Sequence, residues 1–408
     1  MATLWLTVRS KGDMGVTEFL LVMLLMWSAF ICVYFRGRNI DVATWMWAFA
    51  ILFRVTGLFA EPIFEDDWYR YLWDGRTFVA EGNPYDRQPA AYFAIEVTER
   101  FERILGDVNY PDVPTIYGPV CQYVFAASYL VAPGELWPLK VVLLLADCIV
   151  IWCLLRLTTV RNTLLYAWCP LAVFETAINA HAEILGVAPA IWCLFLSYRG
   201  RACSALSAIG IACAARIHAT LLVPFILIRV ERRNWWLLPV TFALVYAPFW
   251  LQGSLADWAG LKAFLGNWEF NSTVYAVLAS TAGVQWAKVI SGLGFALAYS
   301  LLWWSRKKHG QTVPRGDIIY GLFFLFSAVA NPWYMLWLLP FVAVFPSVTG
   351  IVACAVVSLS YVHGLNVDSA SLGPYEHPWW VRPAEVVAVV IAFAVDLMRR
   401  SMAKRKTR

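Results

Sequence analysis

The sequence predicts an all-α, polytopic membrane protein, and three observations support this fold class. Of the 408 residues, 61% are hydrophobic and only 14% are charged, whereas ordinary soluble domains are roughly half apolar. Apolar runs such as VTEFLLVMLLMWSAFICVYF and VVLLLADCIVIWCLLRL have about the length that a helix needs to cross a bilayer core. Basic residues gather in short clusters between such runs, as they do in cytoplasmic loops.

The basic clusters also orient the predicted spans. Placing the clusters in the cytoplasm predicts about thirteen transmembrane helices, with the N-terminus outside, the C-terminus inside and a basic cytoplasmic tail at 399–408. The segments at 203–217 and 219–229 could instead form one long helix. The expected spans are residues 17–35, 40–60, 137–157, 163–178, 183–198, 203–217, 219–229, 235–251, 284–304, 317–331, 333–346, 348–364 and 382–398.

Two stretches interrupt this pattern, a long one at 61–138 and a shorter one at 252–283, and both fall on the extracytoplasmic side. In the first, AAYFAIEVTERFERILGDV mixes apolar and charged residues and predicts a helix in the membrane interface. The run YGPVCQYVFAASYLVAP predicts a second helix, interfacial or re-entrant, because a span there would place Arg156 and Arg161 outside. With no repeat and no soluble insert, residues 1–408 are expected to form one membrane-embedded domain, with its function in these two loops.

Charge and cysteine content exclude several classes of protein. The net charge of +5 is explained by the cytoplasmic clusters, so it does not indicate a nucleic-acid partner. The nine cysteines form no CxxC pair and most lie inside apolar runs, which is typical of small packing residues rather than zinc ligands or a disulfide framework.

An acidic cluster stands out in this apolar chain. In FEDDWYRYLWDGRTFVAEGNPY, residues Glu65, Asp66 and Asp67 follow shortly after the end of a predicted span and lie next to interfacial aromatic residues. A carboxylate at a wet membrane surface, with Arg70 and Arg76 nearby, stays ionised and can accept a proton from a hydroxyl, as a general base does. Solvated loop charges are the simpler interpretation, but three adjacent carboxylates repel one another.

The same carboxylates could hold Mg²⁺ or Mn²⁺ through their oxygens. A base is preferred over a metal site because the rest of the loop offers no further ligand set. The predicted enzyme therefore requires no metal or other cofactor. Sequence alone leaves the choice between Asp66 and Asp67 open.

Other ionisable residues fall within or beside the predicted spans, where a charge costs at least roughly 2.5 kcal/mol at the bilayer centre. Glu175, His181 and Glu183 lie toward the outer end of their helices, on the same side as the acidic cluster, and so do Arg216 and His218. A structural interpretation pairs Glu175 with an arginine and gives His181 an interhelical hydrogen bond.

The functional interpretation of these residues is phosphate binding. Arg216, His218 and Arg70 would bind a phosphate group, because a guanidinium fits phosphate oxygens. Trp333 and Tyr334 follow Asn331-Pro332 and suit either core packing or stacking against a sugar or a lipid tail.

These motifs together resemble a known family. EDDWYRYLWDGRTFVAEGNPYDRQP resembles the first extracytoplasmic loop of the polyprenyl-phosphate-sugar-dependent glycosyltransferases of the GT-C superfold, in particular bacterial alpha-mannosyltransferases of the mycobacterial mannopyranosyltransferase type. Further anchors are Tyr117-Gly118-Pro119, CPLAVFETAINAHAEI and PWYMLWLLP. Two departures are Cys169, where such families have Asn, and Glu183, where Asp is common.

The resemblance implies a GT-C-like fold and a hexosyltransferase of the plasma (inner) membrane. It would move a sugar, mannose in this family, from a polyprenyl phosphate to a glycolipid or glycan acceptor at the outer face, with inversion. Its partners would be the lipid-linked donor, the acceptor and membrane lipid, with no nucleic acid. Asp66 and Asp67 would be catalytic. The expected substrate-binding residues are Glu65, Tyr69, Arg70, Asp74, Asn83, Tyr85, Tyr117, Glu175, His181, Glu183, Arg216, His218, Trp333 and Tyr334.

A lipid-linked sugar flippase or a secondary transporter is the alternative from another class. There, Glu175, His181 and Arg216 would relay protons or bind an anionic head group. Transporters usually show internal repeats and sites near the midplane, whereas this chain shows no evident repeat and its polar residues gather toward one surface. A purely structural scaffold would not need the acidic cluster.

Overall fold

The computed structural model describes residues 1–12, 14–36, 42–309, 313–367, 369 and 371–406. Within these residues the chain is all-helical, and the one β-type pairing is an isolated bridge between Phe270 and Val329. The chain folds into two compact units: unit one comprises Met1–Phe53, Leu157–Val173 and Glu269–Arg408, and unit two comprises Arg54–Arg156 and Phe174–Trp268. The single-domain arrangement stays a prediction.

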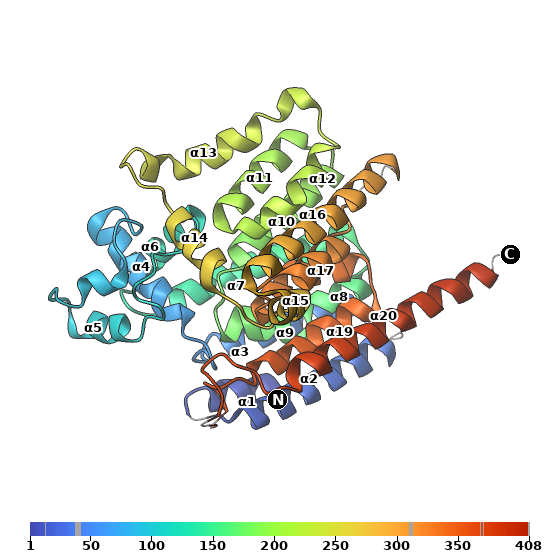
Figure 1. The fold of residues 1–408 in the computed structure, drawn as a ribbon, viewed down its shortest axis with the longest axis horizontal. Coiled ribbons are helices and arrows are strands. Elements are labelled where there is room, and N and C mark those ends of the chain that lie inside the picture. The colour runs from blue at the N-terminus through green and yellow to red at the C-terminus, as the bar shows by residue number, and fades with distance from the viewer. Residues whose placement is uncertain (13, 37–41, 310–312, 368, 370, 407–408) are drawn as a thin grey trace. The chain divides into compact units, whose positions relative to one another are not determined.

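Unit one contains the N-terminal and C-terminal helices. In Figure 1, α19 lies beside α20, and the Asp396 carboxylate of α20 accepts hydrogen bonds from the backbone N–H groups of Val348 and Thr349, which begin α19. A carboxylate at this position satisfies donors that a helix start leaves without partners. The helices of unit one are α1 (Ala2–Arg9), α2 (Val16–Arg36), most of α3 (Val42–Gly57), α8 (Val160–Ala167), α9 (Pro170–Val173), α15 (Val274–Ala282), α16 (Val284–His309), α17 (Gly316–Phe326), α18 (Met335–Val344), α19 (Val348–Val356) and α20 (Val381–Lys406).

Unit two contains most of the predicted functional residues. Its α10, α11 and α13 pack side by side (Figure 1), and α4 packs against both α5 and α6. The helices of unit two are α4 (Asp67–Glu81), α5 (Glu99–Gly106), α6 (Pro119–Val131), α7 (Trp137–Leu157), α10 (Ile184–Tyr198), α11 (Ala202–Ala215), α12 (Val223–Leu227), α13 (Leu237–Trp250) and α14 (Trp258–Asn267).

Three helices in the described part of the chain are long and apolar enough to cross a bilayer: Val16–Arg36, Trp137–Leu157 and Val284–Lys307. Several shorter apolar helices, among them Ile184–Tyr198 and Gly316–Phe326, occupy other expected spans. The protein is therefore a helical membrane protein, whereas the number of thirteen spans stays a prediction. The predicted basic tail reaches 407–408, which lie outside the described residues.

The expected span at 163–178 is wrong as a continuous helix. Helix α8 ends at Ala167, α9 begins at Pro170, and a π-helical turn follows over Phe174–Ile178. Proline has no N–H to donate and its ring clashes with the preceding turn, so the break falls at Pro170. The expected span at 317–331 similarly stops at Phe326.

The segments at 203–217 and 219–229 are separate elements rather than one long helix. Helix α11 ends at Ala215, and Arg216 is extended, with φ −147° and ψ 133°. A 3₁₀ turn over Ile217–Leu222 then leads into α12. The same break takes Arg216 and His218 out of any continuous helix.

Local structure in the two loops differs from the prediction. The acidic stretch, interpreted as a loop, is largely the helix α4, whereas the interfacial helix expected over AAYFAIEVTERFERILGDV reduces to a 3₁₀ turn at Pro89–Tyr92 and α5 at Glu99–Gly106. The run YGPVCQYVFAASYLVAP does contain a helix, α6. The stretch at 252–283 holds α14 and α15, which periodicity did not reveal.

Candidate active site

Helix α4 carries the acidic pair at its start. Asp66 is the N-cap residue and Asp67 is the first helical residue, where a negative charge is favourable because backbone N–H groups point outward from the helix. The helix ends at Glu81 and is capped by Gly82, whose φ of 80° is a left-handed conformation that glycine adopts without strain. The sequence thus places both carboxylates at a defined helix end rather than in a mobile loop.

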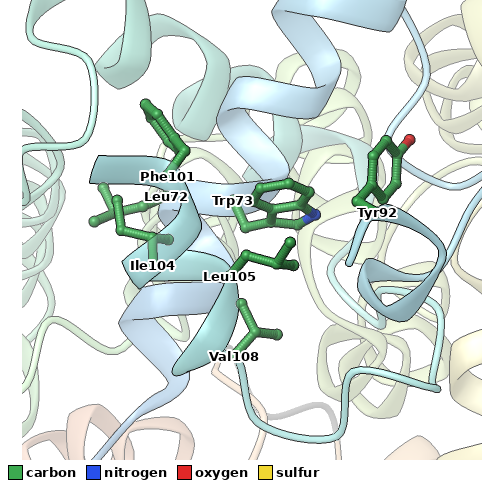
Figure 2. Close-up of a cluster of buried hydrophobic side chains, with 7 residues drawn as sticks. All are labelled: Leu72, Trp73, Tyr92, Phe101, Ile104, Leu105 and Val108. Atoms are coloured by element: carbon green, nitrogen blue, oxygen red, sulfur yellow. The ribbon is translucent and has the colours of Figure 1, made fainter. Parts of the chain in front are cut away.

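A hydrophobic cluster fixes α4 in place. Leu72 and Trp73 of α4 pack against Phe101, Ile104 and Leu105 of α5 (Figure 2). Burying a large apolar side chain contributes about 1.5–3 kcal/mol, so these contacts hold the helix firmly. Tyr92 and Val108 complete the cluster.

The WDG part of the YRYLWDG motif has a structural role at each position. Trp73 fills the hydrophobic cluster, and the Asp74 carboxylate accepts a hydrogen bond of 2.9 Å from the Gln122 amide of α6. A Cβ at Gly75 would collide with the backbone of Phe125, so only glycine allows α4 and α6 to approach this closely. Asp74, predicted to bind substrate, is buried in this helix contact.

Two further motifs converge on Tyr117. Asn83 accepts a hydrogen bond from the backbone N–H of Tyr85, which closes the GNPY turn, and the Tyr85 hydroxyl donates to the carbonyl of Tyr117 at 2.9 Å. A Cβ at Gly118 would overlap the backbone of Ala214, so the YGP turn sits directly on the end of α11. Asn83 and Tyr85 therefore position Tyr117.

Tyr117 connects the acidic pair to Arg216. Its hydroxyl donates to the Asp67 carboxylate at 3.0 Å, and the Arg216 guanidinium lies over its ring, 4.9 Å from the centroid. Arg216 also forms an ion pair with Glu183, the residue just before α10. His218, two residues further along, is buried. Four predicted site residues from separate elements of unit two, Asp67, Tyr117, Glu183 and Arg216, thus form one contact network.

The two carboxylates have different electrostatic environments. Burial and, to a lesser degree, the neighbouring Asp67 charge raise the pKa of Asp66 to about 6, although a hydrogen bond of 3.0 Å from the Asn109 amide opposes this shift. Burial also raises the pKa of Asp67, but the Tyr117 hydroxyl and Arg216 oppose this shift. In contrast to Asp67, Asp66 has no arginine among the main groups that shift its pKa.

A second polar pair, Glu175 and His181, lies in the segment that leads into α10. The imidazole of His181 is 3.3 Å from the Glu175 carboxylate, and both side chains are fully buried. The Asn179 side chain accepts a hydrogen bond of 2.9 Å from the backbone N–H of Ile63, three residues before Asp66. Of the two arginines predicted as partners of Glu175, Arg54 forms an ion pair with Asp147 and Arg216 forms one with Glu183. The pairing of Glu175 with an arginine stays a prediction.

Arg70, predicted to bind phosphate, faces a different part of the loop. One of its guanidinium nitrogens lies 3.0–3.3 Å from the carbonyls of Asn109, Tyr110 and Val113, to which it donates. It therefore holds the segment whose Asn109 amide contacts Asp66. Tyr69 stacks on Trp68, with ring centroids 3.8 Å apart.

The remaining predicted site residues are Glu65, Trp333 and Tyr334. Glu65 is half-buried directly before the acidic pair. Trp333 and Tyr334 belong to unit one, where they form a 3₁₀ turn with Pro332 and their rings meet edge to face. Their predicted roles in substrate binding stay predictions.

Sequence reasoning missed several members of the site. The Tyr71 hydroxyl lies 3.5 Å from that of Tyr117, and the Asn109 amide holds Asp66. In the second loop, the Asp257 carboxylate accepts a hydrogen bond from Tyr246, and burial raises its pKa to about 6. Tyr71 could have been found from its place in the acidic stretch, but only the fold brings Asn109 and Asp257 to this region.

Backbone strain marks the same region. Among the non-glycine residues with positive φ, Tyr110 is adjacent to Asn109, Ala180 to His181 and Ala256 to Asp257. Phe64, two residues before Asp66, also has a positive φ. Such conformations cost about 1–3 kcal/mol each and cluster at functional sites. Among the described residues, no group of three or more His, Cys, Asp or Glu side chains is placed to hold a metal ion.

A raised-pKa carboxylate beside a second carboxylate and an arginine can perform acid–base group transfer in an apolar helical protein. The family model for the N-terminal domain of alpha-(1→6)-mannopyranosyltransferase matches residues 2–232, so the chain belongs to this family. No curated protein matches the chain. Membership identifies a membrane glycosyltransferase with a sugar donor and an acceptor as substrates, and the matched residues include the whole network around Tyr117.

Proposed function

We propose that this protein is a mannosyltransferase of GT-C-like fold that moves mannose from a polyprenyl phosphate to a hydroxyl of a glycolipid or glycan, with inversion. The observation that carries the proposal is the Asp66–Asp67 pair, linked through Tyr117 to Arg216, in a chain of the mannopyranosyltransferase family. Family membership favours this enzyme over a flippase or a transporter.

Asp66 is the proposed general base. Its pKa of about 6 lies near the working pH, where a base combines proton affinity with a large ionised fraction. The Asn109 amide orients one carboxylate oxygen, and the other accepts the proton of the acceptor hydroxyl. The hydroxyl oxygen attacks the anomeric carbon from the face opposite the phosphate, the bond to phosphate breaks, and the configuration inverts.

The leaving phosphate needs charge stabilisation more than protonation. Arg216 supplies it, because a guanidinium carries five N–H donors and can bond phosphate while keeping its Glu183 partner. His218 and Arg70 are the proposed secondary contacts. Asp67, held by Tyr117, orients the network and favours the positive charge of Arg216.

The proposed setting is the outer face of the plasma membrane. About thirteen spans, oriented by the basic clusters, would place α4 and the second loop outside. A carboxylate base does not require a metal, so transfer is proposed to continue in a chelator. The lipid tail of the donor would contribute about 0.8 kcal/mol per buried CH₂.

The test is transfer of labelled mannose by the purified protein to a glycolipid extract, with parallel reactions containing polyprenyl-phosphate mannose, nucleotide-linked mannose or a chelator. We expect transfer from the polyprenyl donor alone, unchanged by the chelator. Transfer from the nucleotide sugar alone would contradict the donor assignment, and loss of transfer in the chelator would contradict the metal-free mechanism. Analysis of the anomeric configuration of the product tests inversion.

A further inference from the structure

A cavity of about 370 Å³ opens at the C-terminal ends of α7 and α10. Three arginines line it: Arg156 in the last turn of α7, Arg199 just after α10, and Arg201. All three side chains are exposed, and none has a carboxylate partner within the described residues. The volume lies in the range of small-ligand pockets, about 300–1,000 Å³.

Aromatic side chains form the wall of this cavity. Trp152 stacks on Trp192 with ring centroids 5.5 Å apart, and Phe195 meets Trp152 edge to face at 4.9 Å. The Arg156 guanidinium lies over the Trp152 ring, 5.2 Å from its centroid. Three cations beside an apolar wall suit a ligand that carries a negative charge and an apolar portion.

An apolar stripe continues from the cavity along α7. Val141, Leu145 and Ile149 are exposed and follow one another at four-residue spacing, so they share a helix face. Trp152 and Arg156 continue that face into the cavity. An acyl chain laid along this stripe would bring its head group to the three arginines.

The cavity lies far from the proposed active site. Helix α10 runs from Ile184, next to Glu183, to Tyr198, next to Arg199, and its 15 residues span about 22 Å at 1.5 Å per residue. The two sites therefore lie at opposite ends of one helix. In the topology that the basic clusters predict, the arginine end faces the cytoplasmic leaflet, which carries anionic lipid.

We propose that this cavity binds an anionic phospholipid of the cytoplasmic leaflet, with the phosphate on Arg156, Arg199 and Arg201 and an acyl chain along the α7 stripe. This site is separate from the site of sugar transfer and does not depend on the proposed donor. The bound lipid would anchor the C-terminal ends of α7 and α10, which lie away from the proposed active site.

The test measures binding of acyl-labelled phosphatidylglycerol to the detergent-purified full chain. The variant Arg199→Gln/Arg201→Gln should bind about 30-fold more weakly, because each basic residue near an anionic surface contributes about 1 kcal/mol. The matched control Arg232→Gln/Arg233→Gln removes two exposed arginines of unit two that do not line the cavity, and it should keep wild-type affinity. Thermal unfolding of both variants shows that they are folded.

Competition identifies the ligand class. Unlabelled phosphatidylglycerol should displace the probe, whereas phosphatidylcholine and glycerol 1-phosphate should not. Displacement by glycerol 1-phosphate at the same concentration would overturn the lipid assignment in favour of a free phosphate site. Equal affinity in the two double variants would also overturn the proposal, because the arginines would then only complement the helix ends.

Discussion

Two arginine–carboxylate pairs lie buried in unit two, and they differ in their surroundings. The Arg54 guanidinium of α3 meets Asp147 of α7 at 2.5 Å, both side chains are fully enclosed, and the Thr176 hydroxyl lies 3.3 Å from the same carboxylate oxygen. Arg216 pairs with Glu183 but also lies over Tyr117, which bonds to Asp67. The first pair connects two helices, whereas the second extends to the carboxylates proposed for catalysis.

The comparison shows that burial of an ion pair does not indicate function by itself. A buried pair contributes little net stability, yet removal of one partner is costly because the other charge stays buried. What distinguishes the Arg216 pair is the neighbouring chemistry, because its contact network includes an acidic pair of raised pKa. The predictions below test this distinction, from the largest expected effect to the smallest.

The largest effect is expected at Asp66. Asp66→Asn should lower the rate constant for mannose transfer about 10²–10⁴-fold, because a general base contributes about this much. The matched control is Asp112→Asn, the same substitution at an exposed position of the same loop, and it should transfer at the wild-type rate. Full turnover by Asp66→Asn would move the base to Asp67 or remove it from the mechanism.

At the structural pair, Arg54→Met should destabilise the protein by about 3–5 kcal/mol, because it leaves the Asp147 charge buried without its partner. The measurement is thermal unfolding in detergent together with the yield of monodisperse protein. The double variant Arg54→Met/Asp147→Leu should recover most of the loss. A single variant as stable as wild type would show that water reaches Asp147.

The same substitution at both arginines sharpens the comparison. Arg216→Lys should raise the KM for the lipid-linked donor about tenfold, because a lysine keeps the charge but loses the planar fork that fits phosphate. Arg54→Lys should leave this KM unchanged and lower thermal stability instead. Equal effects of the two variants on KM would contradict a phosphate-binding role for Arg216.

The pH dependence should report Asp66. Its pKa is raised to about 6, so the base is protonated below this pH, and kcat/KM should fall about tenfold per unit as the pH drops below 6. The wild-type profile is measured at saturating acceptor and low donor concentration. A profile that stays flat from pH 8 to pH 5 would be incompatible with this base.

The smallest expected effect is a gain in stability. Folding raises the pKa of Asp66 from its ordinary value of 3.8 to about 6, so ionisation of this carboxyl destabilises the fold progressively as the pH rises from 3.8 to 6, and the full penalty is present above pH 6. At pH 8 the free energy of unfolding of Asp66→Asn should therefore exceed that of wild type by about 1 kcal/mol after allowance for solvent screening. Thermal unfolding measures this as a higher midpoint temperature. This advantage should shrink as the pH falls from 6 toward 4, and an equal advantage at both ends would contradict the raised pKa.

Some of this protein could be predicted from its sequence because it depends on local chemistry. Apolar runs indicated a helical membrane protein, and the crowding of Asp66 and Asp67 in an apolar chain indicated the acidic site region. The GNPY and YGP motifs were predicted to bind substrate, which stays a prediction, whereas their contacts around Tyr117 were not foreseen. The helix α4 was missed because its charged residues hid the pattern of buried positions at Leu72 and Trp73.

Only the tertiary structure decided which of these residues meet. Arg216 reaches Tyr117 because Gly118 lets the turn pack on the end of α11, and Asn109 reaches Asp66 because Arg70 holds its segment. The pKa of Asp66 also depends on burial, which sequence spacing does not contain. Composition and hydropathy are sums over neighbours along the chain, whereas a site is a set of distances between residues far apart in it. The sequence alone therefore determined the class of protein, and packing determined its chemistry.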